Sequence, residues 1–196
     1  MLPVFEKSKP LFVFADEFKQ IESAVNFARK FGLRLVLEGG RDAWRLPSLL
    51  AENKVPVILS DIYALPMRED EHPTISYTLP KKLKDAGIPF CLSSGSATSS
   101  RNLPFQAGTA AAWGLDPADA LRAITLSSAE ILGVGETMGS LEVGKDATLI
   151  VSGGDILEIS ESVVEMEFIQ GRQIDLDDRH KRLYRKYEER YTRESN

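Results

Sequence analysis

Four acidic side chains end or follow apolar runs that are typical of buried strands. Asp16 and Glu17 follow the run Leu11–Ala15, Glu38 ends the second run, and Asp61 follows the third. α/β folds place their sites at the carboxyl ends of parallel strands, so these carboxylates are candidates for one shared site. Such an all-oxygen site would favour Mg²⁺ or Ca²⁺ over Zn²⁺. The structural alternative is that Asp16 and Glu17 begin the following helix and that Glu38 is a loop residue.

A serine-rich segment, residues 93–100, follows the fourth apolar run and precedes Arg101. Its backbone N–H groups, together with Ser94 and Arg101, could bind a small anionic ligand. A nucleophilic serine is disfavoured, because it needs a positioned base and neither His72 nor His180 lies near a strand end. Cys91 lies within an apolar run, which predicts a core residue rather than a reactive thiol.

The composition excludes several classes of protein. The 196 residues include two histidines and one cysteine, so this chain alone can build neither a His-rich metal site nor an internal disulfide. We expect both histidines to be solvated, His72 in a polar loop and His180 in a charged tail. The net charge of -5 and a pI near 5.2 argue against nucleic-acid and membrane-surface partners. No apolar run approaches about 18 residues and no secretory leader is visible, which predicts a cytoplasmic protein.

The first half of the chain alternates between strand and helix patterns. Strands are predicted at residues 11–15, 33–37, 56–60 and 88–92. Helices are predicted before Gly32, over residues 42–53, and over residues 79–86. Strands that are apolar on both faces predict a parallel sheet covered by helices. The periodicity does not decide between an open doubly wound sheet and half of a (β/α) barrel.

The second half changes from helices to short strands and ends in a charged tail. Helices are predicted over residues 106–113, from Pro117, and from an N-cap at Ser127 to Gly133. Strands are predicted at residues 148–151, 163–169 and 173–174. The tail, residues 178–193, has an apolar stripe at helical spacing, made of Leu183, Tyr184, Tyr187 and Tyr191. This stripe predicts a surface helix that docks through its aromatic side chains.

Two segments carry a resemblance to a known family. Residues 120–134 (ALRAITLSSAEILGV) and 138–151 (MGSLEVGKDATLIV) closely resemble the C-terminal signature of the metal-dependent amidohydrolase superfamily, which includes imidazolonepropionase and dihydroorotase. Arg101–Gly108 and Gly171–Arg172 resemble further pieces of the family. The resemblance covers residues 11–175.

The resemblance implies a fold for the whole chain. We expect the C-terminal half of a (β/α)₈ TIM-like barrel, followed by C-terminal strands of a small β-sandwich. The expected units are the half-barrel with its trailing helices over residues 1–134, the sandwich strands over residues 135–176, and the tail helix over residues 177–196.

The resemblance also implies hydrolysis of non-peptide C–N bonds by one or two divalent metals. The family's ligands are a His-x-His on the first strand, a Lys or carboxylate on the fourth, a His on each of the fifth and sixth, and an Asp on the eighth. The last three positions correspond here to Phe14, to Glu38 or Gly39, and to Ser94 or Gly95. We therefore expect no metal ligand and no catalytic residue in this chain.

Three hypotheses about function remain open. The first is a C-terminal portion of an amidohydrolase-like protein that is not catalytic on its own. Its open sheet edges and apolar flank would require a missing N-terminal half-barrel or self-association. The second is a metal-dependent C–N hydrolase that is active only with that missing half. The third is a stand-alone α/β domain that binds a small anionic ligand. The candidate ligand or substrate contacts are Asp16, Glu38, Asp61, Ser94 and Arg101.

Overall fold

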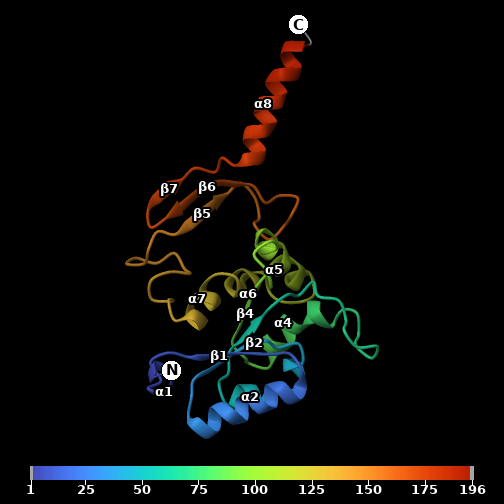
Figure 1. Ribbon diagram of the computed structural model, residues 1–196, viewed down its shortest axis with the longest axis vertical. Coiled ribbons are helices and arrows are strands. Elements are labelled where there is room, and N and C mark those ends of the chain that lie inside the picture. The colour runs from blue at the N-terminus through green and yellow to red at the C-terminus, as the bar shows by residue number, and fades with distance from the viewer. Residues whose placement is uncertain (1, 195–196) are drawn as a thin grey trace.

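The structure is a computed structural model that describes residues 2–194, and its backbone is organised by two β-sheets (Figure 1). The first sheet has four parallel strands in the order β1-β2-β3-β4. Its strands are β1 (Leu11–Ala15), β2 (Leu35–Gly39), β3 (Val57–Leu59) and β4 (Phe90–Leu92). The mixed α/β class and the parallel sheet are confirmed. Because the strands are parallel, their carboxyl ends meet at one edge of the sheet.

The bounds of β2 differ from the sequence prediction. β1 has the predicted bounds, whereas β2 ends at Gly39 instead of Leu37. Phe14 pairs with Glu38, and Ala15 pairs with Gly39. Glu38 is therefore a strand residue and not a loop residue.

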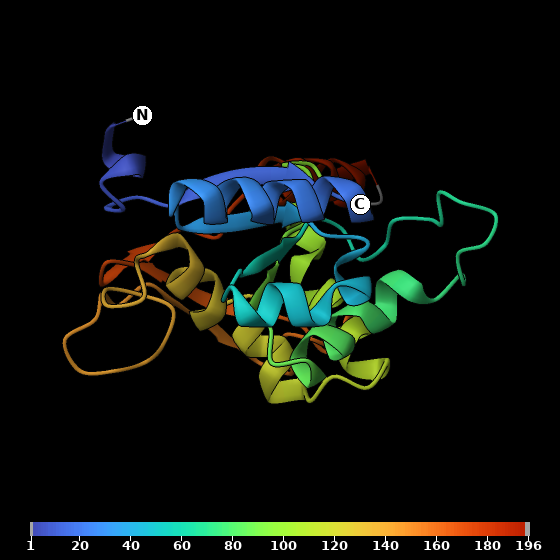
Figure 2. The ribbon, with the colours of Figure 1, turned by 90° about the horizontal axis from the view of Figure 1, so that it is seen from below.

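Helices cover one face of this sheet (Figure 2). They are α2 (Phe18–Phe31), α3 (Pro47–Glu52), α4 (Ile75–Asp85) and α5 (Leu103–Ala112). Leu37 and Leu59 share a buried core with Ile21 of α2, Leu50 of α3 and Leu83 of α4. Apolar burial between these helices and the sheet holds the strand ends in place.

Local signals fix the ends of several helices. Glu17 is the N-cap residue of α2, and Gln20 Oε1 accepts hydrogen bonds from the backbone N–H groups of Asp16 and Glu17, each at 3.2 Å. Gly32 ends α2 with a φ of 62°, a left-handed conformation that glycine adopts without strain. The predicted helix over residues 42–53 is instead a 3₁₀ turn, Ala43–Arg45, followed by α3, because Pro47 begins a new helix at its first position.

The helices on either side of β4 form as predicted, with shifted starts. α4 and α5 begin four and three residues earlier than predicted, at Ile75 and Leu103. α6 (Pro117–Ala123) is capped by Asp116, whose Oδ1 accepts the N–H of Ala118 at 2.9 Å. α7 (Leu126–Leu132) has Thr125 and not Ser127 at its N-cap, and it ends at Gly133 as predicted.

The other face of the first sheet is only partly covered. Register places Phe12 with Val36, and Phe14 with Glu38, Ile58 and Cys91. Phe12 and Phe14 on the edge strand β1 are 43% and 66% exposed. Large aromatic side chains on an open sheet face are unusual for a surface without a partner.

The second sheet is antiparallel and has three strands, β5 (Leu149–Ser152), β6 (Val164–Ile169) and β7 (Arg172–Ile174). The tail forms the predicted helix, α8 (Arg179–Glu194). Within this chain the helix does not dock through its aromatic stripe, because Figure 1 shows α8 extending away from the rest of the chain. Its predicted contact residues stay exposed. A short helix, α1 (Leu2–Phe5), precedes β1.

Over the described residues, every helix is too short or too polar to cross a membrane.

Candidate site at the carboxyl ends of the strands

A small cavity of about 130 Å³ lies where β1 and β3 end, next to the loop after β2. Phe14 contributes an aromatic wall. The polar lining comes from Asp16, Arg41, Ser60, Asp61 and Ser76. Two of the five predicted site residues, Asp16 and Asp61, therefore share one cavity. The edge of the sheet that holds it is the one at which α/β folds place their sites.

Asp16 is held by the loop that follows β2. Its Oδ1 accepts the backbone N–H of Arg41 at 3.2 Å, and its Oδ2 lies 3.6 Å from Arg41 Nη2. Both side chains are about a quarter exposed. The Asp16 carboxylate is thus neutralised by a guanidinium of the same chain, which lowers its capacity to bind a cation.

Gly39 has no space for a side chain. Its φ is +98°, and a Cβ built there would lie 2.6 Å from Asp16 Oδ1 and 3.3 Å from the carbonyl oxygen of Ala15. The left-handed backbone and the adjacent carboxylate together require glycine. Gly39 is one of the two residues, with Glu38, that correspond to the family's metal-binding histidine on the sixth strand.

Asp42, directly after Arg41, is the most buried acidic side chain of this edge, at 1% exposure. Its Oδ2 accepts the backbone N–H of Phe18 at 3.0 Å and an N–H of Arg68 at 2.9 Å, and its Oδ1 accepts a second N–H of Arg68 at 2.5 Å. The hydrogen bonds from Arg68 hold the pKa of Asp42 below its usual value and outweigh the opposing effect of burial. Asp42 thereby fixes the start of α2 beside Asp16.

Arg41 and Asp42 were not among the predicted site residues, although both follow a strand end. Asp16 and Asp61 were selected because they follow predicted strands, and the same criterion would have identified Arg41 and Asp42. The prediction of one continuous helix over residues 42–53 hid this signal, because it assigned Asp42 to a helix and not to the loop after the strand.

The remaining predicted site residues lie outside the lining of this cavity. Glu38 is exposed on the open face of the sheet. Ser94 donates its hydroxyl hydrogen to the carbonyl of Ser96 at 2.9 Å, and Arg101 is exposed at the start of α5. The loop after β4 nevertheless touches the loop after β3, since a Cβ on Gly95 would lie 2.7 Å from the carbonyl oxygen of Ser60. Ser94 is therefore next to the cavity without lining it.

The histidines and the cysteine lie where the sequence predicts. His72 and His180 are exposed, and His72 Nδ1 lies 2.8 Å from Thr74 Oγ1. Cys91 is buried, and desolvation raises the pKa of its thiol to about 11. A thiol with this pKa is protonated at neutral pH and is a poor nucleophile.

The family model described as "Amidohydrolase family" matches residues 20–174. The chain belongs to the amidohydrolase family. An amidohydrolase from Thermotoga maritima MSB8 is 29% identical, with a TM-score of 0.81 over 89% of this chain and 45% of that chain. An adenosine deaminase from Xanthomonas campestris with bound zinc is 22% identical, with a TM-score of 0.57 over 93% of this chain and 51% of that chain.

A third similar structure is an uncharacterized metal-dependent hydrolase from Pyrococcus furiosus, 19% identical, with a TM-score of 0.57 over 70% of this chain and 32% of that chain. At their low identities, the second and third structures support the fold alone. No curated protein sequence matches the chain. This amidohydrolase-family chain spans about half the length of the Thermotoga and Xanthomonas proteins.

The carboxyl-end site does not fit the divalent metal that the resemblance to metal-dependent amidohydrolases implies. Among the described residues, no three His, Cys, Asp or Glu side chains lie together in a metal-binding arrangement. Phe14 and Gly39 offer no donor side chain, and Asp16 is paired with Arg41. Glu38 offers a single carboxylate on the open face of the sheet, outside the lining of the cavity. The side chains of this cavity therefore give no support to a metal-assisted step.

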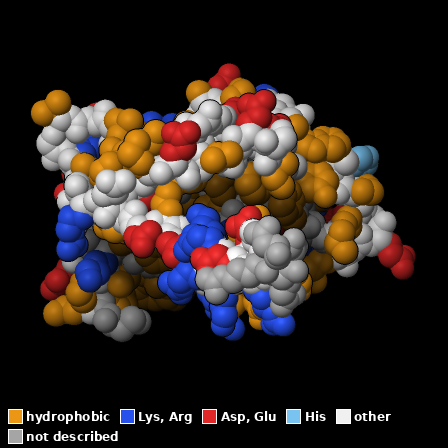
Figure 3. Space-filling view, turned by 90° about the horizontal axis from the view of Figure 1, so that it is seen from above, with side chains coloured by type: hydrophobic (Ala, Val, Ile, Leu, Met, Phe, Trp, Pro, Cys, Tyr) orange, Lys and Arg blue, Asp and Glu red, His pale blue; other side chains and the backbone are white. Residues whose placement is uncertain are grey.

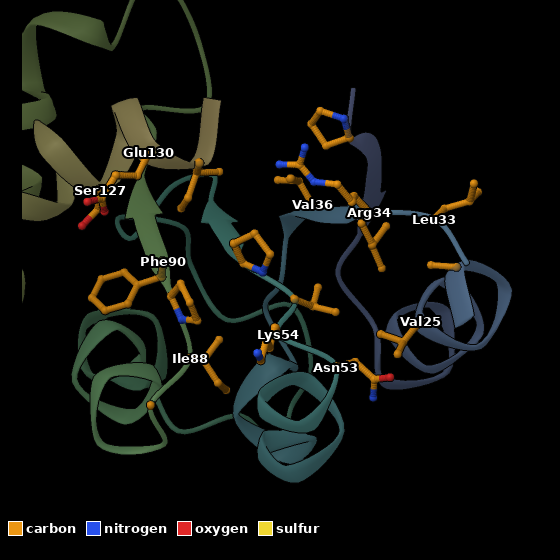
Figure 4. Close-up of a pocket in the computed structure, with 18 of the residues that line it drawn as sticks. Val25, Leu33, Arg34, Val36, Asn53, Lys54, Ile88, Phe90, Ser127 and Glu130 are labelled. Atoms are coloured by element: carbon orange, nitrogen blue, oxygen red, sulfur yellow. The ribbon is translucent and has the colours of Figure 1, made fainter. Parts of the chain in front are cut away.

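A cavity of about 890 Å³ in the amidohydrolase-family chain lies at the opposite ends of the strands (Figure 4). It is surrounded by Val36 and Phe90 of the sheet, by Lys54, and by Ser127 and Glu130 of α7. Active sites of parallel barrels lie at the carboxyl ends, so this cavity is at the wrong end of the sheet for chemistry. We assign the smaller carboxyl-end cavity as the candidate site despite its size.

Proposed function

We propose that the chain is the C-terminal half of an amidohydrolase (β/α)₈ barrel with strands of the family's small sandwich, and that it does not hydrolyse C–N bonds on its own. One observation carries this proposal. Where the family places imidazole ligands on its fifth and sixth strands, this chain has Phe14 and either Glu38 or Gly39. The side-chain space of Gly39 is filled by the Asp16 carboxylate, which pairs with Arg41. Without a bound metal, the hydrolysis of an unactivated C–N bond loses both the activated water that attacks and the Lewis acid that polarises the carbonyl.

The proposed role is to complete a barrel with four strands supplied by another segment or chain. Phe12 and Phe14 support this role, because they are exposed on the side of β1 where a closed barrel would have its interior. The pairing edge of β1 is open in the first sheet, which has β1 at one end of its strand order. The 0.81 TM-score to the Thermotoga amidohydrolase over 45% of that chain agrees with a half-barrel.

The first test is the metal content of the isolated chain. The chain is dialysed against buffer that contains trace amounts of zinc, iron and manganese, and its metal content is then measured by elemental analysis. We expect less than 0.1 equivalent of each metal, because the chain lacks a cluster of donor side chains. As a positive control, the adenosine deaminase from Xanthomonas campestris, whose structure has bound zinc, is carried through the same dialysis. One equivalent of tightly held transition metal in the isolated chain would contradict the proposal.

A second candidate function is favoured by Asp16 and Asp61 sharing the carboxyl-end cavity. In this alternative, the chain is active once a first half-barrel supplies a His-x-His. Mixing the chain with the first half of the Thermotoga protein distinguishes the two functions. A stable complex without hydrolysis of amide or cyclic C–N substrates supports the scaffold role. Metal-dependent hydrolysis that is lost in Asp16→Asn and Asp61→Asn supports the alternative.

A stand-alone role in binding an anion at residues 93–101 has weaker support. The hydroxyl hydrogens of Ser94 and Ser100 are donated to carbonyl groups of the same loop. Titration with inorganic phosphate, followed by calorimetry, tests this third function directly. Millimolar or tighter binding that is lost in Arg101→Met would favour it.

A further inference from the structure

Charge is divided sharply along the chain. Residues 135–178, which contain the three-stranded sheet, have eleven Asp and Glu against two Lys and Arg, a net charge of -9. Residues 179–194, which form α8, have seven Lys and Arg against three Asp and Glu, a net charge of +4. The remaining residues, 1–134, have fifteen of each sign. A basic helix thus directly follows an acidic segment, whose strands themselves carry Glu165, Glu167 and Arg172.

The basic helix also presents apolar surface. Leu183, Tyr184, Tyr187 and Tyr191 are 37%, 66%, 49% and 66% exposed, and their spacing places them along one side of α8. Figure 3 looks down on this helix and shows Lys and Arg side chains gathered around it. Partly exposed tyrosines flanked by basic groups are typical of a protein contact surface.

The helix cannot reach the sheet of its own chain as it is anchored. The N–H of Lys181 donates to Asp178 Oδ1 at 2.9 Å, and Lys181 Nζ donates to the carbonyl oxygen of Leu176 at 2.8 Å. Arg185 Nη2 pairs with Asp177 Oδ1 at 2.7 Å. These contacts hold the first two turns of α8 against the segment that leads into it, so the remaining turns point outward (Figure 1).

The acidic sheet offers a matching surface. A shallow cavity of about 360 Å³ beside β6 and β7 is lined by Glu165, Asp175 and Leu176 among others. On one face of the sheet, register places Glu167 between Ile150 and Ile174, and Ile150 is 47% exposed. The sheet therefore combines carboxylates with exposed aliphatic side chains, the complement of the tyrosines and basic groups of α8.

We propose that α8 docks on the acidic three-stranded sheet of a second copy of this chain, and that the two copies exchange their helices symmetrically. In a reciprocal exchange, α8 of each copy contacts the sheet of the other, so two identical contacts form and the assembly is closed as a dimer. The charges set the orientation and speed the encounter, while the leucine and tyrosine stripe supplies the apolar burial. This dimer does not use the open edge of β1, so it stands or falls independently of the barrel proposed above.

The test is the self-association of the full chain by sedimentation equilibrium. We expect a dimer at 50 mM NaCl whose dissociation constant rises at least tenfold at 1 M NaCl, where the screening length falls to about 3 Å. Arg182→Glu with Lys186→Glu is expected to raise the dissociation constant by at least the same factor. Lys9→Glu with Lys19→Glu makes an equal charge change on exposed residues remote from α8 and leaves the dimer intact.

A charge exchange identifies the receiving surface. Adding Glu165→Lys and Glu167→Lys to the helix variant is expected to restore dimerisation, whereas the same sheet substitutions alone weaken it. Tyr184→Ser with Tyr187→Ser weakens the dimer at both salt concentrations and leaves the circular dichroism of the body unchanged. A monomer at 100 µM and low salt overturns the proposal. So does a dimer that both sets of charge variants leave unchanged, or an α8 that instead binds RNA or anionic vesicles.

Discussion

Asp42 and Arg68 form a two-point ion pair between segments 26 residues apart in the sequence. Asp42 is 1% exposed, while the Arg68 side chain is 38% exposed. Because Asp42 also accepts the N–H of Phe18, this one carboxylate joins the loop after β2, the start of α2 and the loop before α4. The position of the candidate site depends on this connection, since Arg41 and Asp16 lie directly beside it.

Removing Arg68 should be costly for the fold. Arg68→Met leaves the Asp42 carboxylate buried with only part of its partners, and we expect a loss of about 2 kcal/mol in the free energy of unfolding. The value is below that of a fully buried pair because Arg68 is partly solvated. Urea unfolding measures it. Lys81→Met, which breaks the exposed pair with Asp85, is the control and should cost less than about 0.5 kcal/mol. Equal losses in the two variants would disprove the structural role of Asp42.

The same pair predicts a pH dependence. The folded-state pKa of Asp42 is lowered from 3.8, chiefly by the hydrogen bonds from Arg68. A lowered folded pKa adds stability above the unfolded pKa, and this stability is lost as the pH falls through the folded value. Asp42→Asn should therefore be less stable than the natural chain at pH 7, with the gap closing below pH ~4. Urea midpoints between pH 2.5 and pH 7 test it. A gap that is constant across this range would contradict the assignment.

The parts of the fold that sequence could predict are those with local causes. The bounds of β1 and the helix ends at Gly32 and Gly133 follow from apolar runs and left-handed glycines. The outward direction of α8 could not be predicted from its tyrosine stripe, because an amphipathic pattern says that a helix has an apolar side and not what covers it.

The candidate site was predictable only in part, for a similar reason. Asp16 and Asp61 were found because each follows a strand. Glu38 also met this criterion, but the two-residue shift of β2 places it within the strand, on the open face of the sheet. The pairing of Asp16 with Arg41 depends on parallel register between β1 and β2, which only the tertiary structure fixes.

Gly39 should tolerate no side chain. Gly39→Ala meets both a left-handed backbone and the Asp16 carboxylate, so we expect a loss of about 3 kcal/mol in the free energy of unfolding. Gly87→Ala is the matched control, because Gly87 has a φ of +69° and open space around its Cβ position. It should lose only the backbone part, about 1 kcal/mol. Thermal unfolding of the two variants side by side measures the difference, and equal losses would show that Asp16 does not crowd this position.

The open face of β1 should bind hydrophobic dyes. Phe12→Ser with Phe14→Ser removes two exposed rings from the face that a second half-barrel would cover, so 8-anilinonaphthalene sulfonate fluorescence of the isolated chain should fall. Phe27→Ser with Phe31→Ser, which removes an exposed ring pair of α2, controls for the number of rings and should change the signal less. The same two double variants are also compared for their binding to a complementary half-barrel, which the Phe12 and Phe14 substitutions should weaken more. A larger effect from the α2 pair would locate the apolar contact surface on the helices.

The buried amide of Gln106 in α5 should destabilise the fold. It is 1% exposed, and within the described part of the chain its Oε1 has no hydrogen-bond partner. A buried acceptor without a partner costs about 1–3 kcal/mol, so Gln106→Met, which keeps the volume and removes the oxygen, should raise the free energy of unfolding by about 1 kcal/mol.

Gln20→Met is the control with the opposite expected sign, because Gln20 Oε1 accepts two backbone N–H groups at the start of α2. Its loss should destabilise the chain by about 1 kcal/mol. If Gln106→Met destabilises the chain as well, its amide makes a hydrogen bond that matters to the fold, and α5 is packed differently from the arrangement described above.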